Sequence, residues 1–286
     1  MKILRAFPRR TNLSPDDEDV RFDPPGFFDE ADRIDISVLF SWDRDYAEWL
    51  AEQWKPIAPV EIGGPAYNKP SGEFIPGKYV KRGAVITSRG CPNKCWFCSV
   101  WKREPELIEL PVTDGFNVLD DNLLACSEGH IREVFAMLKR QKERAQFTGG
   151  LEAAILKDWH IELLTELNPA QMFFAYDTPD DKEPLRIASI KLHEAGFNRQ
   201  KLRCYCLIGY PKDTMGKAEE RLQFCLECGF FPMAMLWKDL NGYADKEWMR
   251  FQKVWARPAS IYSKWKLLEH KMKHTLKISE SNKTGM

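Results

Sequence analysis

The chain has 286 residues, 44% of them hydrophobic, and its 42 lysines and arginines balance 42 aspartates and glutamates. A chain of this length can bury a large core, as one barrel-sized domain or as two smaller units. A formal charge of zero gives no general attraction to nucleic acid, which would need a local basic patch. Because no apolar run approaches the ~18 residues of a membrane span and the start lacks the apolar core of a signal peptide, we expect a cytoplasmic protein without a membrane partner.

The first 80 residues are rich in proline and acidic side chains, and we expect them to form a short α/β unit. Residues 34–40 and 59–64 have the composition of strands, and residues 46–54 between them have that of a helix. This order predicts a small βαβ unit. It is too short for a complete doubly wound domain.

From residue 81 onward, apolar strand-like runs alternate with helical patterns, which is typical of parallel strands covered by helices. Several of the runs lack alternation, as expected of strands buried on both faces. We therefore predict a partial (β/α)6 barrel over residues 81–258, followed by a helical extension and a frayed tail over 259–286. The six predicted strands are residues 84–88, 116–119, 145–148, 171–176, 202–208 and 230–237.

The helices between these strands have recognisable ends. Ser127 and Thr214 are good N-caps, whereas Gly196 and Gly229 are expected to end helices. Two apolar stripes at helical spacing predict packing against the barrel. Their members are Ile131, Val134, Phe135 and Leu138 in one helix, and Trp248, Phe251 and Trp255 near the C-terminus.

Three of the eight cysteines, Cys91, Cys95 and Cys98, lie within eight residues directly after the first predicted barrel strand. In β/α barrels, the loops that follow the strands carry the catalytic residues. Spacings of four and three residues let one loop aim three thiolates at a common centre, and thiolates favour iron-sulfur clusters, zinc or copper. Three ligands on a four-iron cube leave one iron open, as in a catalytic centre. Such clustering suits metal binding better than a secreted disulfide framework.

The pattern Cys91-x3-Cys95-x2-Cys98, with Phe97 directly before the third cysteine, resembles the signature of the radical S-adenosylmethionine (SAM) superfamily. The resemblance implies that each cysteine binds one iron of a 4Fe-4S cluster and that SAM chelates the fourth. It also implies an enzyme that receives an electron from a flavodoxin- or ferredoxin-like donor, cleaves SAM to methionine and a 5′-deoxyadenosyl radical, and abstracts hydrogen from a substrate. The protein would position these cofactors and exclude water.

Further residues at the ends of predicted strands are implied to contact SAM, because in this superfamily these ends form the mouth that receives it. Asp121 and Asn122 stand where Gly-Gly-Glu is frequent, so a carboxylate there would bind the methionine amine. Asp177 falls near the expected ribose and Gly209 near the adenine. Turn glycines and helix-capping acids are common structural alternatives. The predicted cofactor contacts are Phe97, Asp121, Asn122, Gly149, Gly150, Glu152, Asp177 and Gly209.

Four other cysteines are paired on one strand and on the helix that follows. Cys204 and Cys206 alternate on the strand and point the same way, and Cys225 and Cys228 share a helix face. A second cluster there would be chemically reasonable, but small apolar side chains of a core are the commoner role. We interpret these four and Cys126 as core residues and predict a single cluster.

The whole chain resembles a reduced relative of radical SAM proteins that carry a cobalamin-binding domain. All five histidines lie at position 130 or later, so residues 1–80 offer no imidazole ligand for cobalt. No cobalamin is therefore expected. We predict hydrogen abstraction from a small molecule or from a modified residue or nucleotide, and the sequence identifies neither the substrate nor the catalytic residues.

Two alternatives remain open at this point. One is a non-enzymatic iron-sulfur electron-transfer protein or a zinc protein, in which His130 or His160 would be a fourth zinc ligand. The other is radical modification of a nucleobase in nucleic acid. Its support is limited to basic residues that are usually just solvated, namely Lys94, Lys102, Arg103, Lys264, Lys266, Lys271 and Lys273.

Overall fold

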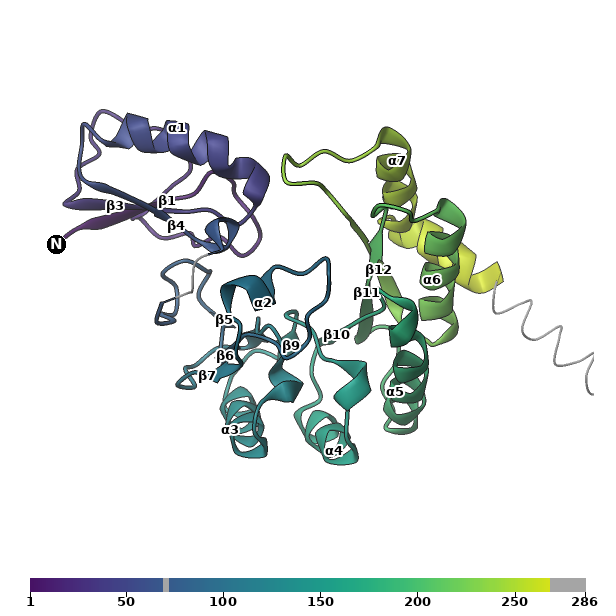
Figure 1. The fold of residues 1–286 in the computed structure, drawn as a ribbon. Helices are drawn as coiled ribbons and strands as arrows, with labels where there is room; N and C mark the ends of the chain where they lie inside the picture. The colour runs from purple at the N-terminus through teal and green to yellow at the C-terminus, as the bar shows by residue number, and fades with distance from the viewer. Residues whose placement is uncertain (69–71, 268–286) are drawn as a thin grey trace, which may run out of the picture. The chain divides into compact units, whose positions relative to one another are not determined.

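The structure is a computed structural model that describes residues 1–68 and 72–267. The chain divides into two compact units, the first formed by residues 1–151, 163–170 and 240–242 and the second by residues 152–162, 171–239 and those from 243 on (Figure 1). The domain boundary predicted at residue 80 falls inside the first of these two units and would divide it further. That boundary remains a prediction. Residues 258–267 are helical, and the expected frayed tail lies outside the described residues.

The first unit opens with a parallel sheet of order β2-β1-β3-β4. The apolar side chains of this sheet pack with those of helix α1 (Arg44–Trp54), where Leu50 and Trp54 are fully buried. The predicted βαβ unit is confirmed as β3-α1-β4, but the sequence analysis missed β1 and β2 because both are short and mix apolar with basic residues. The strands are β1 (Ile3–Ala6), β2 (Val20–Arg21), β3 (Arg33–Ser37) and β4 (Val60–Gly63).

A second sheet has the strand order β12-β11-β10-β9-β8-β5, and its pairs β5–β8, β8–β9, β10–β11 and β11–β12 are parallel. All six predicted strands are confirmed, which agrees with a partial α/β barrel. The first predicted strand is divided, because residues 88–89 leave this sheet and pair antiparallel with a short strand, β7. The strands are β5 (Ala84–Val85), β6 (Ser88–Arg89), β7 (Ile108–Glu109), β8 (Asn117–Val118), β9 (Gln146–Phe147), β10 (Gln171–Ala175), β11 (Leu202–Ile208) and β12 (Phe231–Leu236).

The predicted helix ends are confirmed. The Ser127 hydroxyl accepts a hydrogen bond from an N–H of the first turn of α3 at 3.2 Å, and Thr214 does the same for α6. Gly196 and Gly229 follow α5 and α6 with positive φ angles, which end a helix without strain. The remaining helices are α2 (Val100–Arg103), α3 (Glu128–Lys139), α4 (Asp158–Leu167), α5 (Lys182–Glu194), α6 (Met215–Glu227) and α7 (Lys246–Trp255), and the short 3-10 turns are η1 (Ser41–Asp43), η2 (Pro65–Tyr67), η3 (Leu123–Ala125), η4 (Ala153–Ile155) and η5 (Pro179–Asp181).

Both predicted apolar stripes lie in the core. In the first unit Phe135 of α3 stacks on Phe147 of β9 with ring centroids 5.5 Å apart. In the second unit Trp248, Phe251 and Trp255 of α7 belong to one apolar cluster with side chains of β11 and α6. These stripes therefore act as barrel packing, as predicted.

Burial alternates along β11. Leu202, Cys204, Cys206 and Ile208 are fully buried, whereas the residues between them are only partly buried. The sheet of the second unit is thus closely covered on one face, where α5 and α6 lie (Figure 1). This alternation leaves the opposite face of β11 for other contacts.

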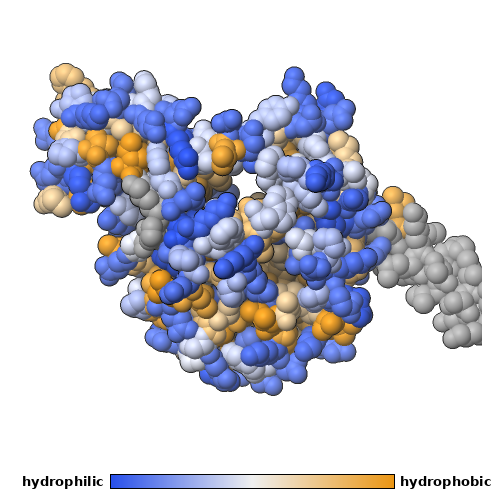
Figure 2. Space-filling view, in the orientation of Figure 1, coloured by the Kyte–Doolittle hydropathy of each residue, from blue (hydrophilic) through white to orange (hydrophobic). Residues whose placement is uncertain are grey.

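The surface in Figure 2 is mostly hydrophilic, with apolar residues in small groups between charged ones. One exposed apolar pair in the first unit is Phe27 and Phe28, whose ring centroids lie 5.1 Å apart. Within residues 1–68 and 72–267, the helices are too short or too polar to cross a membrane.

Candidate metal centre

The three clustered cysteines lie on one loop between β6 and β7, which contains the short helix α2. All three are partly buried, and none of the eight cysteines, all within the described ranges, forms a disulfide. Gly90 leads into the loop with φ of 84°, and a Cβ atom there would collide with the carbonyl oxygen of Glu106. Glycine is therefore needed directly before Cys91, where the two arms of the loop approach each other.

Amide groups point at two of the three sulfurs. The backbone N–H of Asn93 and the side-chain amide of Asn122 each donate to the Cys91 Sγ at 3.4 Å, and the Val100 N–H donates to the Cys98 Sγ at 3.4 Å. Burial raises the pKa of the Cys98 thiol, and the nearby Cys91 thiol adds to this. Hydrogen bonds to sulfur are among the interactions that tune iron-sulfur centres, so this loop suits thiolate ligands.

The structure also bears on the alternative of a zinc site with His130 or His160 as a fourth ligand. Among the residues that the structure describes, no three His, Cys, Asp or Glu side chains gather closely enough to hold one metal ion. His130 instead contacts the Thr87 hydroxyl at 3.3 Å, and the Lys157 N–H donates to His160 Nδ1 at 3.0 Å.

Asp120, directly after β8, anchors the start of the cysteine-bearing segment. Its carboxylate accepts hydrogen bonds from the Thr87 N–H and hydroxyl, both at 2.6 Å, and from the Ser88 hydroxyl at 2.8 Å. The side chain is almost completely buried, and this burial raises its pKa although the hydrogen bonds oppose the shift. Asp120 is thus a structural tie between β8 and β6 rather than an open ligand-binding group.

Asp121 and Asn122 bind the loop itself. The Asp121 carboxylate accepts a hydrogen bond from the Gly90 N–H at 2.9 Å and lies 3.8 Å from the guanidinium of Arg103. Asn122 contacts the Cys91 sulfur, as described above. The structure therefore brings both predicted cofactor residues to the cysteines. Arg103, which the sequence suggested only as part of a basic patch, turns out to be a member of this site.

Two more predicted residues of the first unit follow β9. A Cβ atom on Gly149 would collide with the backbone of Asp120, so glycine permits the ends of β8 and β9 to lie close together. Gly150 has φ of 108°, and open space surrounds the position of its missing Cβ. Phe97, inside the cysteine loop, packs edge-on against Trp96 with centroids 5.4 Å apart.

The other predicted cofactor residues, Glu152, Asp177 and Gly209, belong to the second unit. Glu152 is partly buried and directly precedes η4. The Asp177 carboxylate accepts a hydrogen bond from the Leu207 N–H at 2.7 Å, which links the end of β10 to β11. Burial raises the pKa of Asp177 to about 6. A shifted carboxyl at a strand end is a feature of functional sites as well as of structural ties.

Gly209 sits at the turn after β11, with φ of 72°. Its N–H donates to Asp213 at 2.9 Å, and Asp213 forms a buried ion pair with Arg221 of α6 at 2.7 Å. Arg221 also donates to the Leu207 carbonyl oxygen at 2.9 Å. No local sequence signal indicates this ion pair, which fixes the turn where an adenine contact is predicted.

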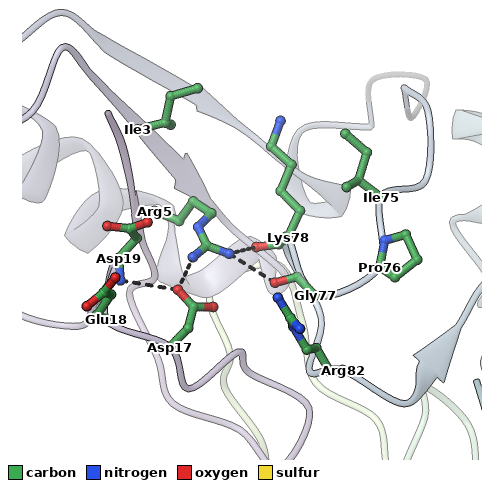
Figure 3. A pocket seen from close by; sticks show the side chains of 10 residues that line it. All are labelled: Ile3, Arg5, Asp17, Glu18, Asp19, Ile75, Pro76, Gly77, Lys78 and Arg82. Carbon is green, nitrogen blue, oxygen red and sulfur yellow. Dashed lines mark hydrogen bonds and ion pairs between the residues drawn. The ribbon is translucent and has the colours of Figure 1, made fainter. Parts of the chain in front are cut away.

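A cavity of about 370 Å³ in the first unit is lined by none of the predicted site residues (Figure 3). Arg5 points into it and donates to the carbonyl oxygens of Gly77 and Lys78 at 2.9 and 2.8 Å. The guanidinium also pairs with Asp17. Its charge is therefore neutralised within the protein, and these contacts tie β1 to the segment before the barrel.

No protein-family model matches this chain, and no curated protein matches it in sequence. Among solved structures, its fold is similar to that of TsrM from Kitasatospora setae, a radical SAM methyltransferase determined with cobalamin and a 4Fe-4S cluster bound. The TM-score is 0.58 and the sequence identity 9%, over 82% of this chain and 74% of the TsrM chain. The similarity therefore concerns the fold, which is the partial α/β barrel predicted from the sequence.

Proposed function

We propose that this protein is a radical SAM enzyme that holds a 4Fe-4S cluster on Cys91, Cys95 and Cys98 and abstracts hydrogen from a substrate. The observation that carries the proposal is the cysteine loop, which receives amide hydrogen bonds at its sulfurs and follows the first strand of the barrel sheet. The fold shared with TsrM supports it independently, because the three-cysteine pattern and the barrel are separate features.

When bound, the cluster and SAM would supply the electron and the adenosyl radical, and the residues of this chain would place and shield them. Asn122 and the loop amides hold the sulfurs through hydrogen bonds. The Asp121 carboxylate accepts a hydrogen bond from the Gly90 N–H and so holds the backbone directly before Cys91 in place. Partial burial of the cysteines limits access of water.

We further propose that SAM contacts residues at the ends of the barrel strands. In the first unit, Asp121 and Asn122 stand beside the cluster ligands and offer polar atoms to the methionine part of SAM. The electron would come from a flavodoxin- or ferredoxin-like donor. The full proposed set is Phe97, Asp121, Asn122, Gly149, Gly150, Glu152, Asp177 and Gly209.

Cobalamin is bound in the TsrM structure, but we propose that this protein does not retain it. No histidine precedes His130, so the N-terminal sheet offers no imidazole for cobalt. The test is the absorption spectrum of protein incubated with cobalamin and then desalted. A stoichiometric, shifted corrin band would reject this proposal.

The experiment that tests the function is anaerobic reconstitution with iron and sulfide, followed by reduction with dithionite in the presence of SAM and candidate substrates. We expect 5′-deoxyadenosine and methionine, quantified by chromatography, in equal amounts. A protein that carries a complete four-iron cluster but yields neither product would reject the enzymatic proposal and favour electron transfer.

A further inference from the structure

Arg203 of β11 is a half-buried cation without an ionic partner in the part of the chain that the structure describes. Its Nε atom is buried and has no hydrogen-bond acceptor. Burial alone lowers its pKa, with no contribution from a neighbouring charge. By contrast, the buried guanidinium groups of Arg5 and Arg221 are paired with Asp17 and Asp213. A cation that is partly removed from water and has no ionic partner lowers the stability of the folded protein unless an anion binds to it.

The surroundings of Arg203 are apolar. Its guanidinium lies over the ring of Phe231, with the Cζ atom 4.5 Å from the centroid. The register of β11 and β12 places Tyr205 beside Met233 and Leu207 beside Met235. Tyr205 and Leu207 alternate with the buried residues of β11, and Met233 and Met235 are their partners on β12, so these four side chains share the face opposite α6. We call this set together with Arg203 the open face; it comprises Arg203, Tyr205, Leu207, Met233 and Met235. Phe231 also packs against the apolar cluster on the α6 side.

The open face remains accessible although it is apolar. Met233 and Met235 are 37% and 45% exposed, and Tyr205 and Leu207 are partly buried. Adjacent exposed methionines are unusual on a surface that only meets water, because their burial against a ligand is favourable. Methionine side chains also adapt to apolar ligands of different shape.

Arg203 lies at one end of the open face, and the proposed SAM site lies at the other. Arg203 is the second residue of β11, and Leu207 lies four residues later, roughly 13 Å along the strand. Gly209, at which we place the adenine of SAM, follows directly after β11. A molecule held by an anionic group at Arg203 would therefore extend its apolar part toward the strand end where SAM is proposed to bind.

We propose that the open face binds an elongated apolar organic anion, with a carboxylate or phosphate at Arg203 and the apolar body over Tyr205, Leu207, Met233 and Met235. A guanidinium binds either group with two parallel hydrogen bonds. The reacting hydrogen would lie at the end of the molecule remote from its charge. This inference names the substrate class and rests on the proposed function for the reaction, though not for the binding.

The binding test uses the reconstituted protein and calorimetry with four probes: decanoate, decyl phosphate, decanol and butanoate. We expect decanoate or decyl phosphate to bind, and the tighter of the two identifies the anionic group. Decanol lacks the charge and butanoate lacks the length, so both should bind at least about tenfold more weakly. If decanol binds as tightly as the preferred long anion, the charge has no role. If butanoate does so, the apolar chain has no role. If neither decanoate nor decyl phosphate binds, the proposal is wrong.

Arg203→Gln should weaken binding of the preferred anion by about tenfold or more and leave decanol binding unchanged. The matched control is Arg250→Gln, which removes an exposed arginine of α7 and should bind as the wild type does. Should Arg203→Gln fail to fold, Met235→Glu at an exposed position places a like charge on the open face and should reduce anion binding. Unchanged affinity in either folded variant overturns the assignment.

The two proposals fail separately. If the protein binds the anion but does not cleave SAM, the proposed function is rejected and the open face remains a binding site. Cleavage of SAM by a protein that binds neither long anion would keep the proposed function and reject the substrate class.

Discussion

The side-chain amide of Asn122 donates a hydrogen bond to the sulfur of Cys91, 31 positions earlier in the sequence, across a distance of 3.4 Å. Asn122 is almost fully buried after β8. The bond therefore attaches the end of one strand to the first proposed cluster ligand. Groups of this kind orient and tune the ligands of a metal centre.

Asn122→Ala should weaken the cluster without abolishing it. We expect iron to be lost to a chelator about tenfold faster than from the wild type, and SAM cleavage to fall by a similar factor. Gln141→Ala is the matched control, since it removes an exposed amide that binds Asp114. If Asn122→Ala releases iron at the wild-type rate, the hydrogen bond does not support the cluster.

Replacement of Cys91, Cys95 or Cys98 by alanine should abolish both the cluster and SAM cleavage, because each thiolate is the proposed ligand of a separate iron. Cys126→Ala is the control. Burial raises the pKa of the Cys126 thiol to about 11, which keeps it a neutral core side chain. Iron analysis and the 5′-deoxyadenosine assay measure the outcome, and retention of cleavage in any of the first three variants contradicts the ligand assignment.

The second group of cysteines is a buried thiol cluster. Cys204 and Cys206 of β11 and Cys225 of α6 are fully buried, and this burial raises the pKa of Cys204 and Cys225. Cys228 is buried as well, and its burial raises the pKa of its thiol to about 11. Free cysteines that are fully buried in a core commonly act as small apolar side chains.

We therefore expect about four irons per chain, as for one cluster. The double variant Cys225→Ala, Cys228→Ala should retain this iron content and SAM cleavage, while its free energy of unfolding falls by about 1 kcal/mol per site. Metal analysis and urea denaturation measure the two effects. About eight irons in the wild type and about four in the double variant would instead establish a second cluster.

Asp177 should make stability depend on pH. Its pKa rises from 3.8 to about 6 in the folded state because the carboxyl is buried. The folded chain therefore holds this proton more tightly than the unfolded chain does. The resulting stabilisation is complete below about pH 4 and is lost as the pH rises through about 6.

Asp177→Asn keeps an oxygen that can accept the hydrogen bond from the Leu207 N–H but removes the buried charge. Its free energy of unfolding should exceed that of the wild type by about 2 kcal/mol near pH 7.5 and should differ little near pH 4. Asp180→Asn, at an exposed neighbouring position, should behave as the wild type at both values. Urea denaturation that gives the same pH dependence for Asp177→Asn and the wild type would contradict this.

Local sequence signals determined the elements of the barrel. The run Leu202–Ile208 is a strand over its predicted length, and Ser127 and Thr214 cap the helices that follow them. Such features depend on composition, periodicity and end residues within a few positions. The fold is shared with TsrM at 9% identity, which indicates that the pattern of elements, rather than particular residues, determines the architecture.

Where local signals were weak or absent, prediction failed. β1 and β2 are short and gain their stability from pairing with strands distant in the sequence. Several of the predicted strands were expected to be buried on both faces, but in β11 only alternate residues are fully buried, and side chains of α6 pack with two of them, Cys206 and Ile208. Periodicity in a short apolar run does not reveal which neighbours a folded sheet will have.

The sequence by itself determined the three-cysteine loop, the order of the six strands of the barrel sheet and the ends of several helices. Only the tertiary structure decided that Asn122 reaches Cys91, that Cys204, Cys206 and Cys225 are all fully buried, and that Arg203 has no ionic partner among the described residues. These relationships join or separate side chains that lie far apart along the chain. They depend on which strands pair and which helices cover them, and therefore on the packing of the whole sheet.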